Sequence, residues 1–155
     1  MGIEDRLREM GVTLPEPAAP VAAYVPCVRT GSLVFVSGQI PRRAGLLLYP
    51  GKLGAEVTVE QGQEAARAAV INALAALKAE VGSLDRVRRI VRLNGFVAAA
   101  PDFPDHSKVI DGASVFLQQV FGEAGKHSRI AVGMASLPLN APVEIDLIVE
   151  LEPGS

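Results

Sequence analysis

The order of hydrophobic and polar residues along the chain predicts a mixture of strands and helices. Residues 24–28 and 33–36 are rich in β-branched and aromatic side chains, and they flank the turn-forming sequence "RTGS" at 29–32. This pattern predicts a β-hairpin. The run at 33–36 is continuously apolar, which is typical of a strand buried on both faces. We expect one short edge strand in the glycine-punctuated segment that follows.

The clearest helix is predicted at residues 59–80. Thr58 can cap its start and Gln61 can complete a capping box, while Gly82 ends it. Its apolar residues recur at a spacing of three to four, which predicts one buried face containing Ala66, Val70, Leu74 and Leu77.

A strand within residues 84–100 separates this helix from a second one within residues 105–125. Val109, Phe116 and Val120 are predicted to point inward. Gly112 in the middle of this helix costs about 1 kcal/mol of helix propensity. We therefore expect another element to pack closely against it.

The chain ends in two predicted strands, at 129–135 and 143–151. Alternate residues of the second strand form an unbroken apolar face, and Glu144, Asp146 and Glu150 lie on the other face. The predicted order is ββ(β)αβαββ. Because two helices cannot cover both sides of a wide sheet, the sequence predicts an α+β sandwich. We expect a mixed sheet of about six strands with both helices on one face and other subunits covering the opposite face.

The N-terminal segment predicts a short amphipathic helix with Ile3, Leu7 and Met10 on one side and Gly11 at its end. Several prolines then predict an extended arm. We expect a single domain over residues 1–155, with the helix and arm at 1–19 and the core at 20–152. The helix is expected to cover an outer surface or an interface.

Composition narrows the function classes. The chain has 155 residues, 49% hydrophobic and 21% charged, with a formal net charge of −2. Proteins that bind nucleic acid through phosphates usually carry a basic excess, so nucleic-acid binding is not expected. The basic cluster "RVRRIVR" at 86–92 alternates with apolar residues, which favours the solvated face of a strand over an RNA site.

Few residues offer redox or metal chemistry. Cys27 is the one cysteine, and its apolar surroundings favour a buried hydrophobe over a nucleophile. His106 and His127 lack metal-ligand spacing, so we expect no metal site.

The charged N-terminus does not resemble a signal peptide, and no apolar run approaches the roughly 20 residues that span a bilayer. We expect a cytoplasmic protein without membrane contacts.

One arginine stands out in the penultimate strand. Arg129 shares a face with the small residues Ala131, Gly133 and Ala135, which predicts a pocket in which the guanidinium holds an anion. If the last two strands pair as a hairpin, Glu144 lies near this face and can orient or deprotonate a water. A simple Arg129–Glu144 ion pair remains the alternative.

Several motifs together resemble the RidA family, also called the YjgF/YER057c/UK114 family. They are "YVPCV", "VFVSGQIP" and "HSRIAVGMASLPLNAPVEIDLIVEL", and the resemblance covers about residues 20–152. The segments "NGFVAAAPDF" and "DGASVFLQQVFGEAGKHSR", with the N-terminal helix, look like a longer, less characterised branch of that family.

The resemblance implies a chorismate-mutase-like (bacillus-type) α+β fold and a homotrimer with pockets at the subunit interfaces. It also implies hydrolysis of reactive 2-imino or enamino acids to 2-keto acids and ammonia, without a cofactor. The family's carboxylate-gripping arginine falls on Arg129 and its water-positioning glutamate on Glu144. Its pocket tyrosine, serine and glycine fall on Tyr24, Ser37 and Gly38.

In the implied mechanism, Arg129 holds the substrate carboxylate, while Glu144 and a backbone carbonyl near Ala131 hold the attacking water. Two departures from the family pattern bear on it. Ala131 stands where many relatives carry cysteine, and the segment around Ala113 and Ser114 lacks the asparagine of typical deaminase members. Substrate size or preference is therefore expected to differ.

Other functions remain open from the sequence. The chain can be a non-catalytic trimeric binder of a small carboxylate or amino-acid metabolite, which needs Arg129 but not Glu144. It can be an endoribonuclease or translation inhibitor, a label that some relatives carry, although the acidic balance and the lack of a His-His or His-Lys pair argue against it. A chorismate mutase is the alternative at the level of fold, which alone does not carry activity.

Overall fold

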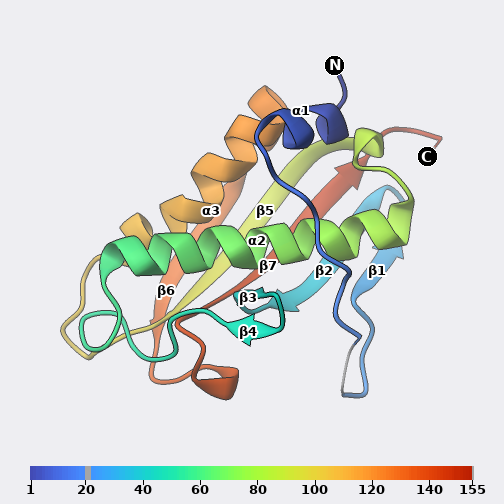
Figure 1. Cartoon of the computed structure of the whole chain (residues 1–155). Helices are drawn as coiled ribbons and strands as arrows, with labels where there is room; N and C mark the ends of the chain where they lie inside the picture. The colour runs from blue at the N-terminus through green and yellow to red at the C-terminus, as the bar shows by residue number, and fades with distance from the viewer. Residues whose placement is uncertain (20–21, 155) are drawn as a thin grey trace.

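A five-stranded mixed sheet with its helices on one face forms the centre of the computed structural model, which describes residues 1–19 and 22–154 (Figure 1). The strand order is β1-β2-β7-β5-β6, and only β5 and β6 run parallel. The strands are β1 (Cys27–Thr30), β2 (Leu33–Gln39), β5 (Val87–Ala98), β6 (Ser128–Met134) and β7 (Val143–Leu151). The predicted α+β architecture is confirmed.

The helices and short turns complete the predicted order. They are α1 (Ile3–Glu9), α2 (Val59–Val81), α3 (His106–Phe121) and the 3₁₀ turns Leu84–Arg86, Gly122–Gly125 and Pro138–Asn140. The main sheet has five strands rather than about six, because the segment after β2 folds into a separate ribbon of β3 (Arg42–Arg43) and β4 (Leu46–Leu47). Positive φ angles of 53° at Ala44 and 79° at Gly45 make the tight turn between these two strands.

Helix α2 follows its sequence signals closely. The Gln61 amide N–H donates to Thr58 Oγ1 at 3.2 Å, and the Thr58 N–H donates to Gln61 Oε1 at 3.0 Å, so the capping box is formed. The residues predicted to be buried are Ala66, Val70, Leu74 and Leu77, and all four have 0% exposure. This face packs on β2 and β7, whose inward residues are equally buried.

Helix α1 covers the ends of the two long helices of its own chain. Leu7 is 3% exposed, Lys78 Nζ of α2 lies 2.6 Å from Glu4 Oε1, and Arg6 donates to the Val120 carbonyl of α3 at 3.2 Å. The chain then crosses α2 as the predicted extended arm (Figure 1). This crossing brings residues 15–19 to the cavity described below.

Helices α3 and α2 are in close contact at Gly112. A β-carbon built on Gly112 would lie 2.1 Å from the carbonyl oxygen of Gln63 in α2. The close packing expected from this mid-helix glycine is confirmed.

We predict that Gly112→Ala destabilises the fold despite the higher helix propensity of alanine. The methyl group meets backbone, which cannot rotate away, so the helices must separate at a cost of about 2 kcal/mol or more. A drop in Tm of about 4–8 °C is expected by calorimetry. The exposed Gln119→Ala on the same helix is the control, and an unchanged Tm for Gly112→Ala would contradict the close contact.

The sheet face opposite the helices carries exposed apolar side chains. Val28, Phe35 and Ile130 are 54%, 41% and 39% exposed. The alternating burial of β7 places Glu144 and Asp146 on this same face, while Val143, Ile145 and Leu147 point to the helices. We call this surface the open face of the sheet.

Candidate functional site

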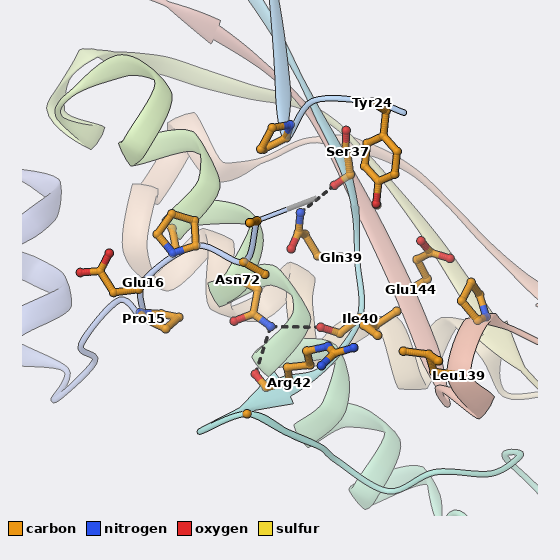
Figure 2. Close-up of a pocket in the computed structure, with 18 of the residues that line it drawn as sticks. Pro15, Glu16, Tyr24, Ser37, Gln39, Ile40, Arg42, Asn72, Leu139 and Glu144 are labelled. Atoms are coloured by element: carbon orange, nitrogen blue, oxygen red, sulfur yellow. Dashed lines mark hydrogen bonds between the residues drawn. The ribbon is translucent and has the colours of Figure 1, made fainter. Parts of the chain in front are cut away.

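A cavity of about 600 Å³ lies where the arm, the end of β2, helix α2 and the start of β7 meet (Figure 2). Tyr24, Ser37, Gly38 and Glu144 line it, which are four of the six residues implied by the family resemblance. Arg129 and Ala131 are not among its lining residues. In one chain, the structure therefore brings Glu144 together with the predicted pocket residues of β2 and the arm, but not with the predicted carboxylate-holding Arg129 or with Ala131.

A β-bulge shapes the cavity wall at Ser37 and Gly38. Val36 pairs with Leu147 and Gln39 pairs with Ile145, so β2 has one more residue than β7 over this stretch. The Ser37 hydroxyl donates to the Val25 carbonyl at 2.7 Å. This hydrogen bond ties the end of β2 to the segment that carries Tyr24.

The Glu144 carboxylate faces the bulge directly. A β-carbon built on Gly38 would lie 2.4 Å from Glu144 Oε2. Burial, and secondarily the charge of Asp146, raise the pKa of Glu144 above its usual range. Among residues 1–19 and 22–154, no group donates a hydrogen bond to this carboxylate. Such a carboxylate is suited to accept a proton from water near neutral pH.

We predict that Gly38→Ala impairs the site without unfolding the protein. Gly38 does not have a positive φ, so alanine fits the backbone, but its methyl group displaces the Glu144 carboxylate. Loss of this position is expected to lower kcat/KM about tenfold for any reaction in which Glu144 accepts a proton. An unchanged Tm with a shifted Glu144 pKa, followed by ¹³C NMR, would confirm the reason, while full activity would argue against a role for this contact.

Arg129 lies on the helix-covered side of the sheet. Its strand partner Leu93 and the next residue across, Leu147, are buried at 0% and 1% exposure. Its guanidinium contacts α3, with Nη1 donating to Asp111 Oδ1 at 2.8 Å and to Ser114 Oγ at 3.0 Å, and Nη2 donating to the Ser107 carbonyl at 3.2 Å. The side chain remains 23% exposed.

The small residues beside Arg129 serve helix packing. A β-carbon built on Gly133 would lie 2.6 Å from His106 Nε2, and Ala131 packs against the core. The expectation that this face of β6 lines a pocket was therefore wrong for the single chain. The face is small because α3 approaches it closely.

The expected hairpin of the last two strands was also wrong, because β5 lies between β6 and β7. Glu144 pairs with Phe96 and Phe96 with Val132, three residues beyond Arg129 on β6. Standard strand dimensions put the Cα atoms of Arg129 and Glu144 roughly 14 Å apart. Since the two side chains also point to opposite faces, they cannot form an ion pair within one chain.

Two contributors to the cavity were missed in the sequence. Asn72 of α2 donates to the carbonyls of Ile40 and Arg42, both at 3.0 Å, and holds the loop after β2 (Figure 2). Its signal was an asparagine within the alanine-rich part of the helix. The N-terminal arm is the second contributor that was missed. Nothing in its prolines indicated that residues 15–19 would border the cavity.

The remaining candidates are consistent with structural roles. Cys27 is 7% exposed, and burial, with a smaller effect of Glu80, raises the pKa of its thiol to about 11. The described residues contain no group of three or more side chains placed to hold a metal ion. Across the same part of the chain, no helix is both long and apolar enough to cross a membrane.

Comparison with known proteins identifies the class. The family described as "YjgF/chorismate_mutase-like, putative endoribonuclease" matches residues 4–151. Protein TCP17 of Trypanosoma cruzi is 46% identical over 146 residues, which cover 94% of this chain and 91% of that protein. A crystal structure of Atu1372 from Agrobacterium tumefaciens, of unknown function, is 48% identical with a TM-score of 0.91 and covers 97% of this chain and 92% of its own.

The fold and the cavity thus define a chorismate-mutase-like α+β protein. The chain belongs to the YjgF family, which is also the RidA family. A more distant relative, the 2-iminobutanoate/2-iminopropanoate deaminase of Dermatophagoides farinae, is 30% identical over 141 residues, covering 91% of this chain and 95% of that protein. The family resemblance expected from the motifs is confirmed.

Proposed function

We propose that this protein hydrolyses reactive 2-imino and enamino acids to 2-keto acids and ammonia, without a cofactor. The Glu144 carboxylate carries the proposal, because it borders the cavity next to Tyr24 and Gly38 and its pKa is raised. The relative named as an imine deaminase supports this reaction class.

We further propose that a second copy of the chain completes the site, within the homotrimer that the family resemblance implies. Arg129 and Glu144 point to opposite faces of one sheet, so a site using both needs two chains. The exposed apolar residues of the open face, Val28, Phe35 and Ile130, offer a surface for this contact. β6 is an edge strand, so Arg129 lies at the rim where a neighbour can approach.

Arg129 retains the donors that a carboxylate requires. Of its five N–H groups, three donate to α3, and within the described residues the Nε–H and one Nη2–H have no acceptor. A substrate carboxylate bound there fixes the position of the imine carbon. The substrate's C=N group would then lie against Glu144 of the neighbouring copy.

The proposed reaction proceeds in two steps. Glu144 accepts a proton from a water whose oxygen bonds to the imine carbon, and the C=N π electrons move to nitrogen. Glu144 returns this proton to the nitrogen, which gives a neutral carbinolamine. The hydroxyl proton of the carbinolamine then passes through Glu144 to the nitrogen as the C–O bond becomes a carbonyl and the C–N bond breaks, so the nitrogen leaves as ammonia. Because the carbon of an imine is already electrophilic, proton transfer to Glu144 is sufficient to promote the attack of water.

The test is turnover of 2-iminopropionate and 2-iminobutyrate, generated in place by an amino-acid oxidase. We expect faster imine loss with the wild type and a decrease of about 100-fold or more with Arg129→Ala. Arg88→Ala, an exposed arginine on β5 with a 4.0 Å contact to Glu150, is the matched control. No acceleration by the folded oligomer, together with Arg129-dependent binding of a 2-keto acid, would favour the non-catalytic binder.

The family description also names an endoribonuclease. Arg92, in the basic cluster of β5, donates to Asn94 Oδ1 at 2.9 Å and to Ser128 Oγ at 3.4 Å, so it is engaged within the sheet. RNA cleavage by nuclease-free protein that disappears in the Arg88→Ala, Arg89→Ala double variant would support that activity. Retention of imine hydrolysis in the same variant would separate the two.

A further inference from the structure

A chain of hydrogen bonds lies behind Arg129, away from the cavity. Arg129 Nη1 donates to Ser114 Oγ at 3.0 Å, Ser114 Oγ lies 2.8 Å from His127 Nε2, and His127 Nδ1 lies 2.7 Å from the Gly125 carbonyl oxygen. Ser114 is 6% exposed and is the one buried polar residue within residues 1–19 and 22–154. A buried hydroxyl in the interior of a helix needs a reason beyond propensity.

The direction of every hydrogen bond in this series follows from the last bond, which ends at the Gly125 carbonyl. A carbonyl oxygen only accepts, so His127 carries a hydrogen on Nδ1, and the neutral ring then presents the lone pair of Nε2. The Ser114 hydroxyl therefore donates to Nε2, which leaves the oxygen lone pairs free to accept from Arg129. Each group thus donates toward Gly125, and the guanidinium receives a fully oriented acceptor.

The other contacts of Arg129 come from the same side of α3. Ser107, Asp111 and Ser114 are spaced by four and three residues, so they share one helix face. Asp111 is 51% exposed and can move, whereas Ser114 is held on both sides. Ser114 and His127 are therefore the rigid part of the support.

We propose that Ser114 and His127 are positioning residues that fix the Arg129 guanidinium with its unused Nε–H and Nη2–H ready for a carboxylate. The proposal rests on the proposed role of Arg129 in substrate binding. Neither residue touches the substrate. Ser114 lies in the segment where this chain lacks the asparagine of typical deaminase members.

The first test requires neither a variant nor turnover. Long-range ¹H–¹⁵N NMR of the wild type is expected to show His127 as the Nδ1–H tautomer, which is the minor form of a free imidazole. In Ser114→Ala, the Nδ1–H tautomer should persist, because the Gly125 carbonyl still accepts from Nδ1, and the Nε2 resonance should shift because it no longer accepts a hydrogen bond. An Nε2–H tautomer in the wild type would overturn the relay.

The second test measures carboxylate binding, with pyruvate as the probe in calorimetry and imine turnover measured in parallel. We expect Ser114→Ala to weaken pyruvate binding and raise KM about tenfold, the effect of losing one charge-assisted hydrogen bond, with kcat within about twofold. His127→Leu should change pyruvate affinity, KM and kcat in the same way as Ser114→Ala. His127→Gln should recover most of the affinity, because its amide oxygen can accept from Ser114.

The outcomes separate this proposal from the proposed function. Ser32→Ala, an exposed serine in the β1–β2 turn, is the control for the same chemical change. Weaker pyruvate binding in Ser114→Ala, without any imine turnover by the wild type, would support the relay and count against the deaminase. Unchanged pyruvate affinity in a folded Ser114→Ala would overturn the positioning role even if the wild type is an active deaminase.

Discussion

Two variants that are each inactive, Arg129→Ala and Glu144→Gln, are expected to restore imine hydrolysis when they assemble together. Within one chain, these side chains point to opposite faces of the sheet with β5 between their strands. If the site uses Arg129 from one copy and Glu144 from its neighbour, a mixed ring contains one intact pair.

The expected recovery can be estimated from the symmetry. With random mixing in equal amounts, three quarters of trimers contain both variants, and each of these has one intact site of three, giving about a quarter of the wild-type activity. The measurement is turnover by co-expressed, differently tagged variants purified through both tags, which keeps only the mixed trimers and raises the expected value to about a third of the wild-type activity. Activity that stays at the level of the single variants would show that the site is not shared in this way. The control is a mixture of the two single variants that were assembled separately and combined only afterwards.

Much of the fold could be predicted because local physical signals and tertiary packing agree. The capping box of Thr58 and Gln61, the inward face of α2 and the mid-helix Gly112 each have a local cause visible in the sequence. Even the turn at 29–32 behaved as expected, with Gly31 at a φ of 60°. These features depend on residues close together in the chain.

The pairing of strands could not be predicted in the same way. Two strands separated by a short turn usually form a hairpin, but β6 pairs in parallel with β5 and leaves β7 to the centre of the sheet. This error moved Glu144 toward Arg129. The pocket expected beside Arg129 has a separate cause. Alternation along a strand shows that Arg129 and Ala131 share a face, but not whether a helix or a cavity lies over it.

The residues of the candidate site also differ in how far the sequence could predict their arrangement. Tyr24, Ser37, Gly38 and Glu144 lie around one cavity because β2 and β7 are neighbours, and all four are residues that the family resemblance implied. The support of Arg129 by Ser114 and His127 depends on contacts between α3 and the segment before β6. Both residues lie within motifs quoted for the family resemblance, but nothing in those motifs relates one to the other, and only the geometry does.

Glu144→Gln is expected to abolish turnover while preserving binding and increasing stability. Removal of the proton acceptor should lower kcat by about 10²–10⁴-fold. Pyruvate affinity should change little, since Arg129 holds the carboxylate in the proposed site. A variant with wild-type turnover would exclude Glu144 as the acceptor.

The gain in stability has a clear pH dependence. Burial and Asp146 raise the folded-state pKa of Glu144 above about 4.3, its unfolded value, so the fold disfavours the charged form. At neutral pH the wild type bears this cost, and glutamine removes it, so Tm should rise by about 1–3 °C. As the pH falls through the folded pKa toward the unfolded one, the wild-type carboxylate takes up its proton, and the difference in Tm between the two proteins should shrink.

Over the same pH interval, wild-type turnover should decline, because the protonated carboxyl cannot accept a proton from water. A Tm difference that grows toward acidic pH would instead mean that Glu144 makes a stabilising interaction as a carboxylate, and a role as base would then lose its physical basis.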